Sequence, residues 1–166
     1  SKPINLSQVP EFDEILKKYG KIIFIYFLTG GIPYYLNQIP QGINFIQAIN
    51  QTFFNNDSIF QEEADEVLRL EFNKAGIVTI KKILSKLGMR GSIYTEIENK
   101  LNISTGNLNE TIEKLIDYKI IFERESFLNR KLKNKRGIKL LMKDFYLNFF
   151  FQIIKPHRQQ IKTNYN

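Results

Sequence analysis

The chain has 166 residues, a mass of 19.6 kDa and a formal net charge of +7. An apolar fraction of 43% with 25% charged residues is typical of folded proteins, which excludes wholesale disorder and low-complexity repeats. Cysteine is absent, which excludes disulfides, thiolate nucleophiles and cysteine-based zinc or iron–sulfur sites, and favours a reducing intracellular setting.

Membrane insertion and secretion are not expected either. The longest apolar run, Ile22 to Leu28, is much shorter than the ~20 residues that a membrane-spanning helix needs. The first ten residues show neither the apolar stretch nor the small-residue cleavage site of a secretory signal. We therefore expect a cytoplasmic protein without a membrane anchor.

The beginning of the chain has the pattern of short helices. Apolar residues at helical spacing predict two helices between Pro10 and Leu28, with Gly20 between them. The run Gly30-Gly31-Ile32-Pro33 ends the second helix and begins a short third one. Glycine suits the end of a helix, and proline suits the first turn of the next.

Two more helices are expected in the first half, around Phe45 to Ile49 and from Ile59 to Phe72, with no strand before Gly76. Four acids lie in the first turns of the second of these helices: Glu62, Glu63, Asp65 and Glu66. They have two interpretations, a carboxylate cluster for a metal or the solvated start of a helix. The second is favoured, because acids stabilise the positive end of a helix.

From Gly76 the pattern predicts three amphipathic helices in succession. The first buries apolar residues on one face and ends at Gly88. Ser92 is expected to cap the second helix, and Ser104 with Thr105 the third.

A β-hairpin and a further helix are predicted to follow. Tyr118 to Arg124 has the composition of a strand, Asn129 to Gly137 that of a turn, and Ile138 to Met142 that of a returning strand. Three helices and a hairpin make the order of a winged helix. A helix with an aromatic cluster from Phe145 to Phe151 then runs to Pro156, and core packing of that cluster is favoured over stacking on unpaired bases.

The positive charge is local. Residues 1–75 carry six basic and nine acidic side chains, whereas residues 76–166 carry eighteen and eight. Residues 126–166 alone carry ten basic side chains and one acid, Asp144. Such a patch attracts polyanions, so nucleic acid is a natural partner, although coding bias and solubility could also explain a chain with 18 lysines.

Two segments are candidates for nucleic-acid contact. The first is the hairpin tip, whose five basic residues could lie along a phosphate backbone or form a solvated loop: Arg130, Lys131, Lys133, Lys135 and Arg136. The second is the outward face of the third helix, with Thr105, Asn107 and Asn109. The two asparagines could read adenine edges, but three acids on the same face oppose DNA: Glu110, Glu113 and Asp117.

No catalytic residues are identified in this chain. A phosphate-binding GxxxxGK[ST] loop does not occur in the sequence. The single histidine, His157, follows Pro156 in a polar tail without acids nearby in sequence, so we expect an exposed residue and no metal site.

Several motifs in order resemble one known family. They are Gly30 to Leu36 (GGIPYYL), the Phe53-Phe54 pair, the segment Phe60 to Phe72, then Gly106-Asn107-Leu108, and late in the chain Asp144-Phe145 with Pro156. Over roughly residues 10–156 the chain resembles the C-terminal part of the archaeal-type ATPases. In that family a P-loop core of the AAA+ and STAND type precedes a helical lid and a winged helix, often with a nuclease-like domain behind.

The resemblance implies a nucleotide contact. Gly31, Ile32 and Pro33 match the GxP motif with which the lid of such ATPases touches bound ATP near its base and sugar; a plain turn between helices is the alternative. ATP would be bound mainly by a core that this chain lacks, so hydrolysis by these residues alone is not expected.

The expected fold class is therefore mainly α. Residues 1–75 would form a helical lid, residues 76–156 a winged helix (helix-turn-helix plus β-hairpin) with a C-terminal aromatic helix, and residues 157–166 a polar tail. The expected function is to couple ATP binding in the core to contact with nucleic acid, most simply DNA, through the wing. The alternatives are a winged helix used for protein docking and, ranked last, a free-standing transcription regulator.

Overall fold

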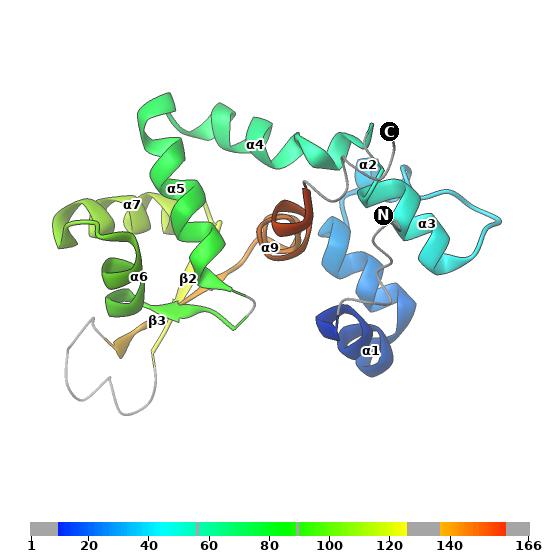
Figure 1. Ribbon diagram of the computed structural model, residues 1–166, viewed down its shortest axis with the longest axis horizontal. Helices are drawn as coiled ribbons and strands as arrows, with labels where there is room; N and C mark the ends of the chain where they lie inside the picture. The colour runs from blue at the N-terminus through cyan, green and yellow to red at the C-terminus, as the bar shows by residue number, and fades with distance from the viewer. Residues whose placement is uncertain (1–9, 56, 89, 126–136, 159–166) are drawn as a thin grey trace.

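Helices dominate the structure, a computed structural model that describes residues 10–55, 57–88, 90–125 and 137–158 (Figure 1). The first half contains α1 (Pro10–Thr29), α2 (Pro33–Leu36), α3 (Phe45–Phe53), the 3-10 helix η2 (Ile59–Gln61) and α4 (Glu63–Glu71). The described residues before Gly76 contain no strand, as the sequence predicted. Among the described residues, none of the helices is long and apolar enough to cross a membrane.

The second half combines helices with a small sheet. Its elements are α5 (Lys74–Leu87), β1 (Ser92–Ile93), α6 (Tyr94–Leu101), α7 (Thr105–Asp117), β2 (Ile121–Arg124), β3 (Lys139–Met142), α9 (Phe145–Phe149) and the π-helix η4 (Phe150–Ile154). The three strands form one antiparallel sheet in the order β1-β3-β2. The short β1 pairs Ser92 with Leu140, so a strand from between two helices joins the hairpin.

Glycines set two of the predicted helix boundaries. Gly20 has φ 77° and ψ 172° within α1, which breaks the helix and confirms two helical pieces. Gly88, with φ 63°, caps the C-terminus of α5 as expected. Both positions use a left-handed backbone that glycine adopts without a steric penalty.

The predicted cap at Ser92 is wrong. Ser92 belongs to β1, and α6 begins at Tyr94 after the N-cap residue Ile93. The Ser92 hydroxyl instead donates to the carbonyl of Lys86 over 3.0 Å, which satisfies an orphan carbonyl at the end of α5. The pairing partner of Ser92 lies almost fifty residues away, so the local pattern did not indicate a strand.

Two other boundaries differ from the prediction. The helix expected from Ile59 to Phe72 is divided into η2 and α4. The first hairpin strand begins at Ile121, since Lys119 takes a left-handed φ of 58° that turns the chain after α7.

The last helix continues through Arg158 and does not end at Pro156. The π-helix η4 ends two residues before this proline, and its wide turns bond each N–H to a carbonyl five residues back, as Lys155 does to Phe150. A π turn shifts the hydrogen-bond register by one residue, so a residue without an N–H can follow it. His157 is accordingly half-buried in a helix and not exposed in a tail.

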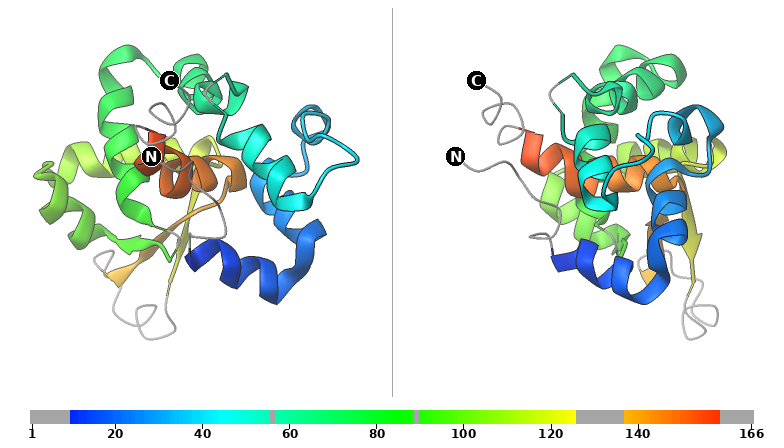
Figure 2. Two further views of the ribbon diagram at one scale, coloured as in Figure 1. Left: turned by 45° about the vertical axis from the view of Figure 1, so that its right-hand side comes forward. Right: turned by 90° about the vertical axis from the view of Figure 1, so that its right-hand side faces the viewer.

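The aromatic helix α9 packs against elements of both halves of the chain. Phe149 and Tyr146 are buried, as predicted, and contact rings from the first half: Phe149 meets Phe53 at 5.3 Å and Tyr146 meets Phe60 at 5.7 Å between centroids. On its other side this helix contacts β3, and η4 contacts α5. Figures 1 and 2 show α9 between α1 and α5.

Candidate functional site

The outward face of α7 carries the predicted DNA-reading side chains. Thr105 and Asn107 are exposed and Asn109 is half-buried. The Thr105 hydroxyl donates to the Glu98 carboxylate of α6, so it is already engaged. Asn107 lines an open groove of about 580 Å³ between α5 and α7, together with Thr111.

Acidic side chains on α7 oppose the binding of a polyanion in this groove. Glu110 accepts a hydrogen bond from Lys114 over 2.7 Å, and this bond lowers the pKa of the Glu110 carboxyl. The ion pair neutralises one carboxylate of the helix. Glu113 and Asp117 are exposed further along α7, so the negative charge is concentrated in the second half of the helix.

Two cations lie at the end of the β2–β3 ladder nearest the predicted turn, which we call the base of the hairpin. There Arg124 is the direct cross-strand partner of Lys139. Within the described residues, neither Arg124 nor Lys139 forms an ion pair with an acidic side chain. Two like charges directly opposite each other destabilise a strand pair slightly, by about 0.2–1 kcal/mol, unless an anion neutralises them.

A buried tyrosine holds this hairpin against the helices. The Tyr94 hydroxyl of α6 donates to the Glu123 carboxylate of β2 over 2.5 Å. Burial, and then the acceptor Glu123, raise the pKa of Tyr94, so the hydroxyl keeps its proton at all physiological pH values. Outside the described residues lie the predicted tip residues Arg130, Lys131, Lys133, Lys135 and Arg136.

The Gly30-Gly31 turn is closed by local hydrogen bonds. Thr29, fully buried, donates its hydroxyl to Ile25 and accepts the N–H of Gly31 over 3.2 Å. Gly31 has φ +73°, and a Cβ there would lie 2.5 Å from the Tyr26 ring. The next residues, Ile32 and Pro33, are exposed at the start of α2.

This turn can present apolar surface but no strong helix dipole, because α2 has only four residues. Large apolar side chains are exposed near the end of α1 and on the segment that leads into and forms α2, and we call them the lid patch: Ile22, Ile23, Tyr26, Ile32, Tyr34 and Leu36. Helical spacing places Ile22 and Ile23 beside Tyr26, whose ring lies next to Gly31. Ile22 is 84% exposed and Tyr34 57%. Single exposed apolar residues are ordinary, whereas a cluster of them marks an interaction surface.

A buried polar contact connects α2 to α4. The Tyr35 hydroxyl donates to Glu63 over 2.9 Å, and the Tyr35 ring lies 5.3 Å from that of Tyr146. Burial, followed by the hydrogen bond to Glu63, raises the pKa of Tyr35. The GxP turn is thus connected through Tyr35 to the aromatic helix α9.

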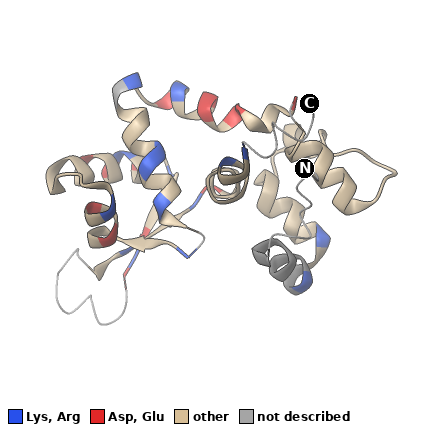
Figure 3. Ribbon diagram, viewed as in Figure 1, with Lys and Arg blue, Asp and Glu red and all other residues tan. Residues whose placement is uncertain are grey.

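The acids of α4 form ion pairs between helices. Asp65 accepts Lys81 of α5 over 2.7 Å, and Arg158 lies 3.9 Å from Asp65 and 3.7 Å from Glu62. The predicted solvated start of a helix therefore fits the exposed Glu66 better than Asp65, whose side chain is only 21% exposed. No group of three or more metal-ligating side chains occurs in the ranges that the structure describes. Figure 3 shows the acids along α4 and the lysines along α5.

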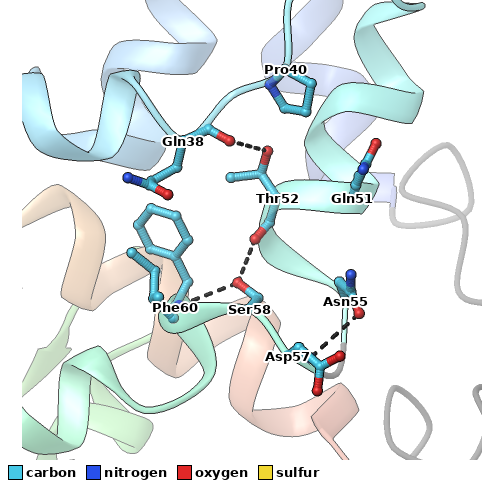
Figure 4. Close-up of a pocket in the computed structure, with 9 residues that line it drawn as sticks. Gln38, Pro40, Gln51, Thr52, Asn55, Asp57, Ser58 and Phe60 are labelled. Atoms are coloured by element: carbon cyan, nitrogen blue, oxygen red, sulfur yellow. Dashed lines mark hydrogen bonds between the residues drawn. The ribbon is translucent and has the colours of Figure 1, made fainter.

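A small pocket of about 230 Å³ lies between the loop after α2 and the end of α3 with the loop that follows it (Figure 4). Its polar groups bond to one another: the Thr52 hydroxyl reaches the Gln38 carbonyl, and the Ser58 hydroxyl donates to the Thr52 carbonyl. The Phe60 N–H donates to the Ser58 hydroxyl. These groups close a loop, so this pocket is not a candidate site.

The predicted site residues fall into two separate regions. Figure 1 shows α2, with Gly31 to Pro33, and α7, with Thr105 to Asn109, at opposite ends of the molecule. Arg124 and Lys139 were not predicted as a cross-strand pair, although their place near the basic turn was a usable signal. The lid patch was not predicted either, because nothing local distinguishes exposed Ile22 from buried Phe24. No family model, curated protein or solved structure matches the chain.

Proposed function

We propose that the chain is the lid and winged-helix part of an archaeal-type ATPase, and that it couples ATP binding in a P-loop core to contact with DNA. The core is a separate or preceding unit, because the sequence holds no phosphate-binding loop. The module acts in the cytoplasm and catalyses no reaction by itself.

The order of elements supports a winged helix over residues 74–142. Helices α5, α6 and α7 are followed by the β2–β3 hairpin, and β1 from between α5 and α6 completes the sheet. In a winged helix of this order, the third helix enters the major groove and the hairpin turn lies on the backbone. Here these elements are α7 and the turn between β2 and β3.

The observation that carries the DNA contact is the pair Arg124 and Lys139. They lie opposite each other at the base of the hairpin without an acid partner in the described structure, on the two strands that flank the predicted basic turn. A phosphate group would neutralise both cations and remove their mutual repulsion. Lys131, Lys133, Lys135 and Arg136 extend the same positive charge along the chain.

The lid patch supports the proposed contact with the ATPase core. It includes Ile32 of the segment that resembles the GxP motif, and the ring of Tyr26 lies beside Gly31. Docked on a core, this surface would become buried, with the glycine allowing close backbone approach to a nucleotide. A shift of α2 would reach α9 through Tyr35 and Tyr146.

A second candidate function is protein docking by the winged helix. The acids on α7 favour it: Lys114 neutralises Glu110, but Glu113 and Asp117 would repel phosphates in a major groove. The two functions differ in their response to salt. Phosphate contact is strongly salt-dependent, whereas docking on a protein predicts no affinity for DNA.

Fluorescence anisotropy with a labelled mixed-sequence duplex tests the proposal. Each phosphate contact contributes about −0.9 to the slope of log affinity against log salt, so four contacts predict a slope of about −3.6. That slope corresponds to a loss of roughly 150-fold between about 50 and 200 mM salt. The fourfold alanine variant of Lys131, Lys133, Lys135 and Arg136 should lose this part of the slope, about −3.6, and keep the part that the hairpin base contributes.

A matched pair of double variants tests the hairpin base. Arg124→Gln with Lys139→Gln should reduce the slope by about 1.8. Arg69→Gln with Lys21→Gln removes the same charges from α4 and α1 and should leave the slope nearly unchanged. Equal effects of the two double variants would attribute binding to net charge and contradict a site on the hairpin. Absence of binding at low salt would favour the docking function.

A further inference from the structure

A second basic region lies away from the hairpin turn, in a cavity of about 610 Å³. The cavity is bounded by the end of α5, the turn that leads to β1, α6 and the last helix. Three cationic side chains and a histidine from these elements line it: Lys86, Arg90, Lys100 and His157. Its volume is within the range of roughly 300–1,000 Å³ that is usual for small-molecule sites.

The charge of this cavity is not balanced. Glu96 is the single carboxylate among its lining residues, and its Oε2 faces the N–H of Ile93 at 3.4 Å. Within the described residues, the three cations Lys86, Arg90 and Lys100 form no ion pair, in contrast to Lys81, which binds Asp65. Lys86 and Lys100 lie in the last turns of α5 and α6, where a cation interacts favourably with the helix dipole. The helix dipole does not explain why Arg90 and His157 line the same cavity.

The walls of the cavity are fixed by hydrogen bonds and close packing. The Ser92 hydroxyl ties β1 to the Lys86 carbonyl, and the Gln152 side chain donates to the Leu84 carbonyl over 3.1 Å. Gly91 has no room for a side chain, because a Cβ would lie 2.3 Å from the Leu140 carbonyl oxygen. The elements that carry the cations are therefore held in place before any ligand arrives, which lowers the entropic cost of binding.

The histidine has a defined hydrogen-bonding role in this wall. His157 Nδ1 lies 2.9 Å from the carbonyl oxygen of Ile153. A carbonyl only accepts, so Nδ1 carries the proton of this bond and Nε2 is the nitrogen left for a ligand or solvent.

We propose that this cavity binds a phosphate group, with Lys86, Arg90 and Lys100 as its cationic ligands. Arginine presents a planar pair of donors that matches two phosphate oxygens, and lysine ammonium groups supply further charge. The group is that of a small phosphate ester or of a nucleic-acid backbone, two sources with the same chemistry. The site is independent of the hairpin contact, so failure of either leaves the other intact.

The test uses the only histidine of the chain as a reporter. Its ring proton resonances are followed by NMR at constant neutral pH while sodium phosphate, pyrophosphate or a short DNA duplex is added to the full chain. Sodium chloride at matched ionic strength is the control. The proposal predicts a saturable shift with phosphate or pyrophosphate that chloride does not produce; a shift with the duplex alone would identify backbone phosphates as the source.

Paired variants locate the site. Lys86→Gln with Lys100→Gln should weaken pyrophosphate binding by about tenfold or more, because each charge-assisted contact is worth roughly that factor. Lys21→Gln with Lys82→Gln has the same net charge and should bind like the wild type, with a thermal unfolding scan verifying that both fold. Phosphate and chloride giving the same shift, or unchanged binding in the first double variant, would overturn the proposal.

Discussion

The Tyr35 hydroxyl donates a hydrogen bond to Glu63 across 2.9 Å and so joins the short α2 to α4. Tyr35 is 6% exposed, so the bond is shielded from water. Tyr35→Phe should lower the free energy of unfolding by about 0.5–1.5 kcal/mol, the usual net value of such a bond. Chemical denaturation of Tyr35→Phe, Glu63→Gln and the double variant measures it. Strictly additive losses would show that the two side chains are not coupled.

The glycine at position 31 tests the geometry of the GxP turn. Gly31→Ala should cost about 1–2 kcal/mol for its left-handed backbone, a cost that the neighbouring Gly30→Ala should share. Only Gly31→Ala places a methyl group against the Tyr26 ring, which lies edge-on to Phe145 at 5.8 Å. The ring is exposed and can move, so we expect the NOEs between Tyr26 and Phe145 to weaken in Gly31→Ala and to persist in Gly30→Ala.

A harder clash is expected at Gly91. A methyl group there would meet the backbone oxygen of Leu140, which cannot move without disrupting the β1–β3 pair. Gly88 has a similar φ and open space around it, so Gly88→Ala is the matched control. Gly88→Ala should cost about 1–2 kcal/mol and Gly91→Ala about 1–3 kcal/mol more. Equal midpoints of thermal unfolding would contradict the position of β1.

The N-cap of α9 predicts a pH dependence. Burial raises the pKa of the Asp144 carboxyl, against the opposing effect of the Leu147 and Tyr146 N–H groups. A raised pKa in the folded state means that the carboxyl stabilises the fold in acid, and that this contribution is lost as the pH rises through the folded pKa. Asp144→Asn keeps the acceptor for Leu147 without the charge.

The stability of Asp144→Asn relative to the wild type should therefore increase from acidic to neutral pH. Asp144→Ala also removes the titrating carboxyl, so it should follow the same trend but stay about 1 kcal/mol less stable than Asp144→Asn at every pH, because it lacks the cap. Urea denaturation at both ends of this range measures the two differences. A relative stability of the Asn variant that falls as the pH rises would contradict the burial of the charge.

Local signals predicted most of the helices of this fold. Gly20 and Gly88 marked helix ends because their left-handed backbone is a property of the residue itself. In contrast, β1 at Ser92 depends on Leu140, and the continuation of the last helix past Pro156 depends on a π turn, neither of which has a local signature.

The candidate sites were predictable only in part. The outward positions Thr105 and Asn107 followed from helical periodicity, and both are exposed. The pairing of Arg124 with Lys139 required the hairpin register, and the cavity around His157 required four elements to converge. Long-range packing decides such sites, so spacing along the chain does not indicate them.

The most direct test of the proposed function is a map of the residues that DNA touches. Amide chemical shifts of the isotope-labelled chain would be recorded while a short duplex is added at low salt. The proposal predicts shifts that concentrate on Asn107, Asn109, Arg124 and Lys139, and that vanish with added salt. Shifts confined to the lid patch, or none at all, would contradict DNA contact through α7 and the hairpin.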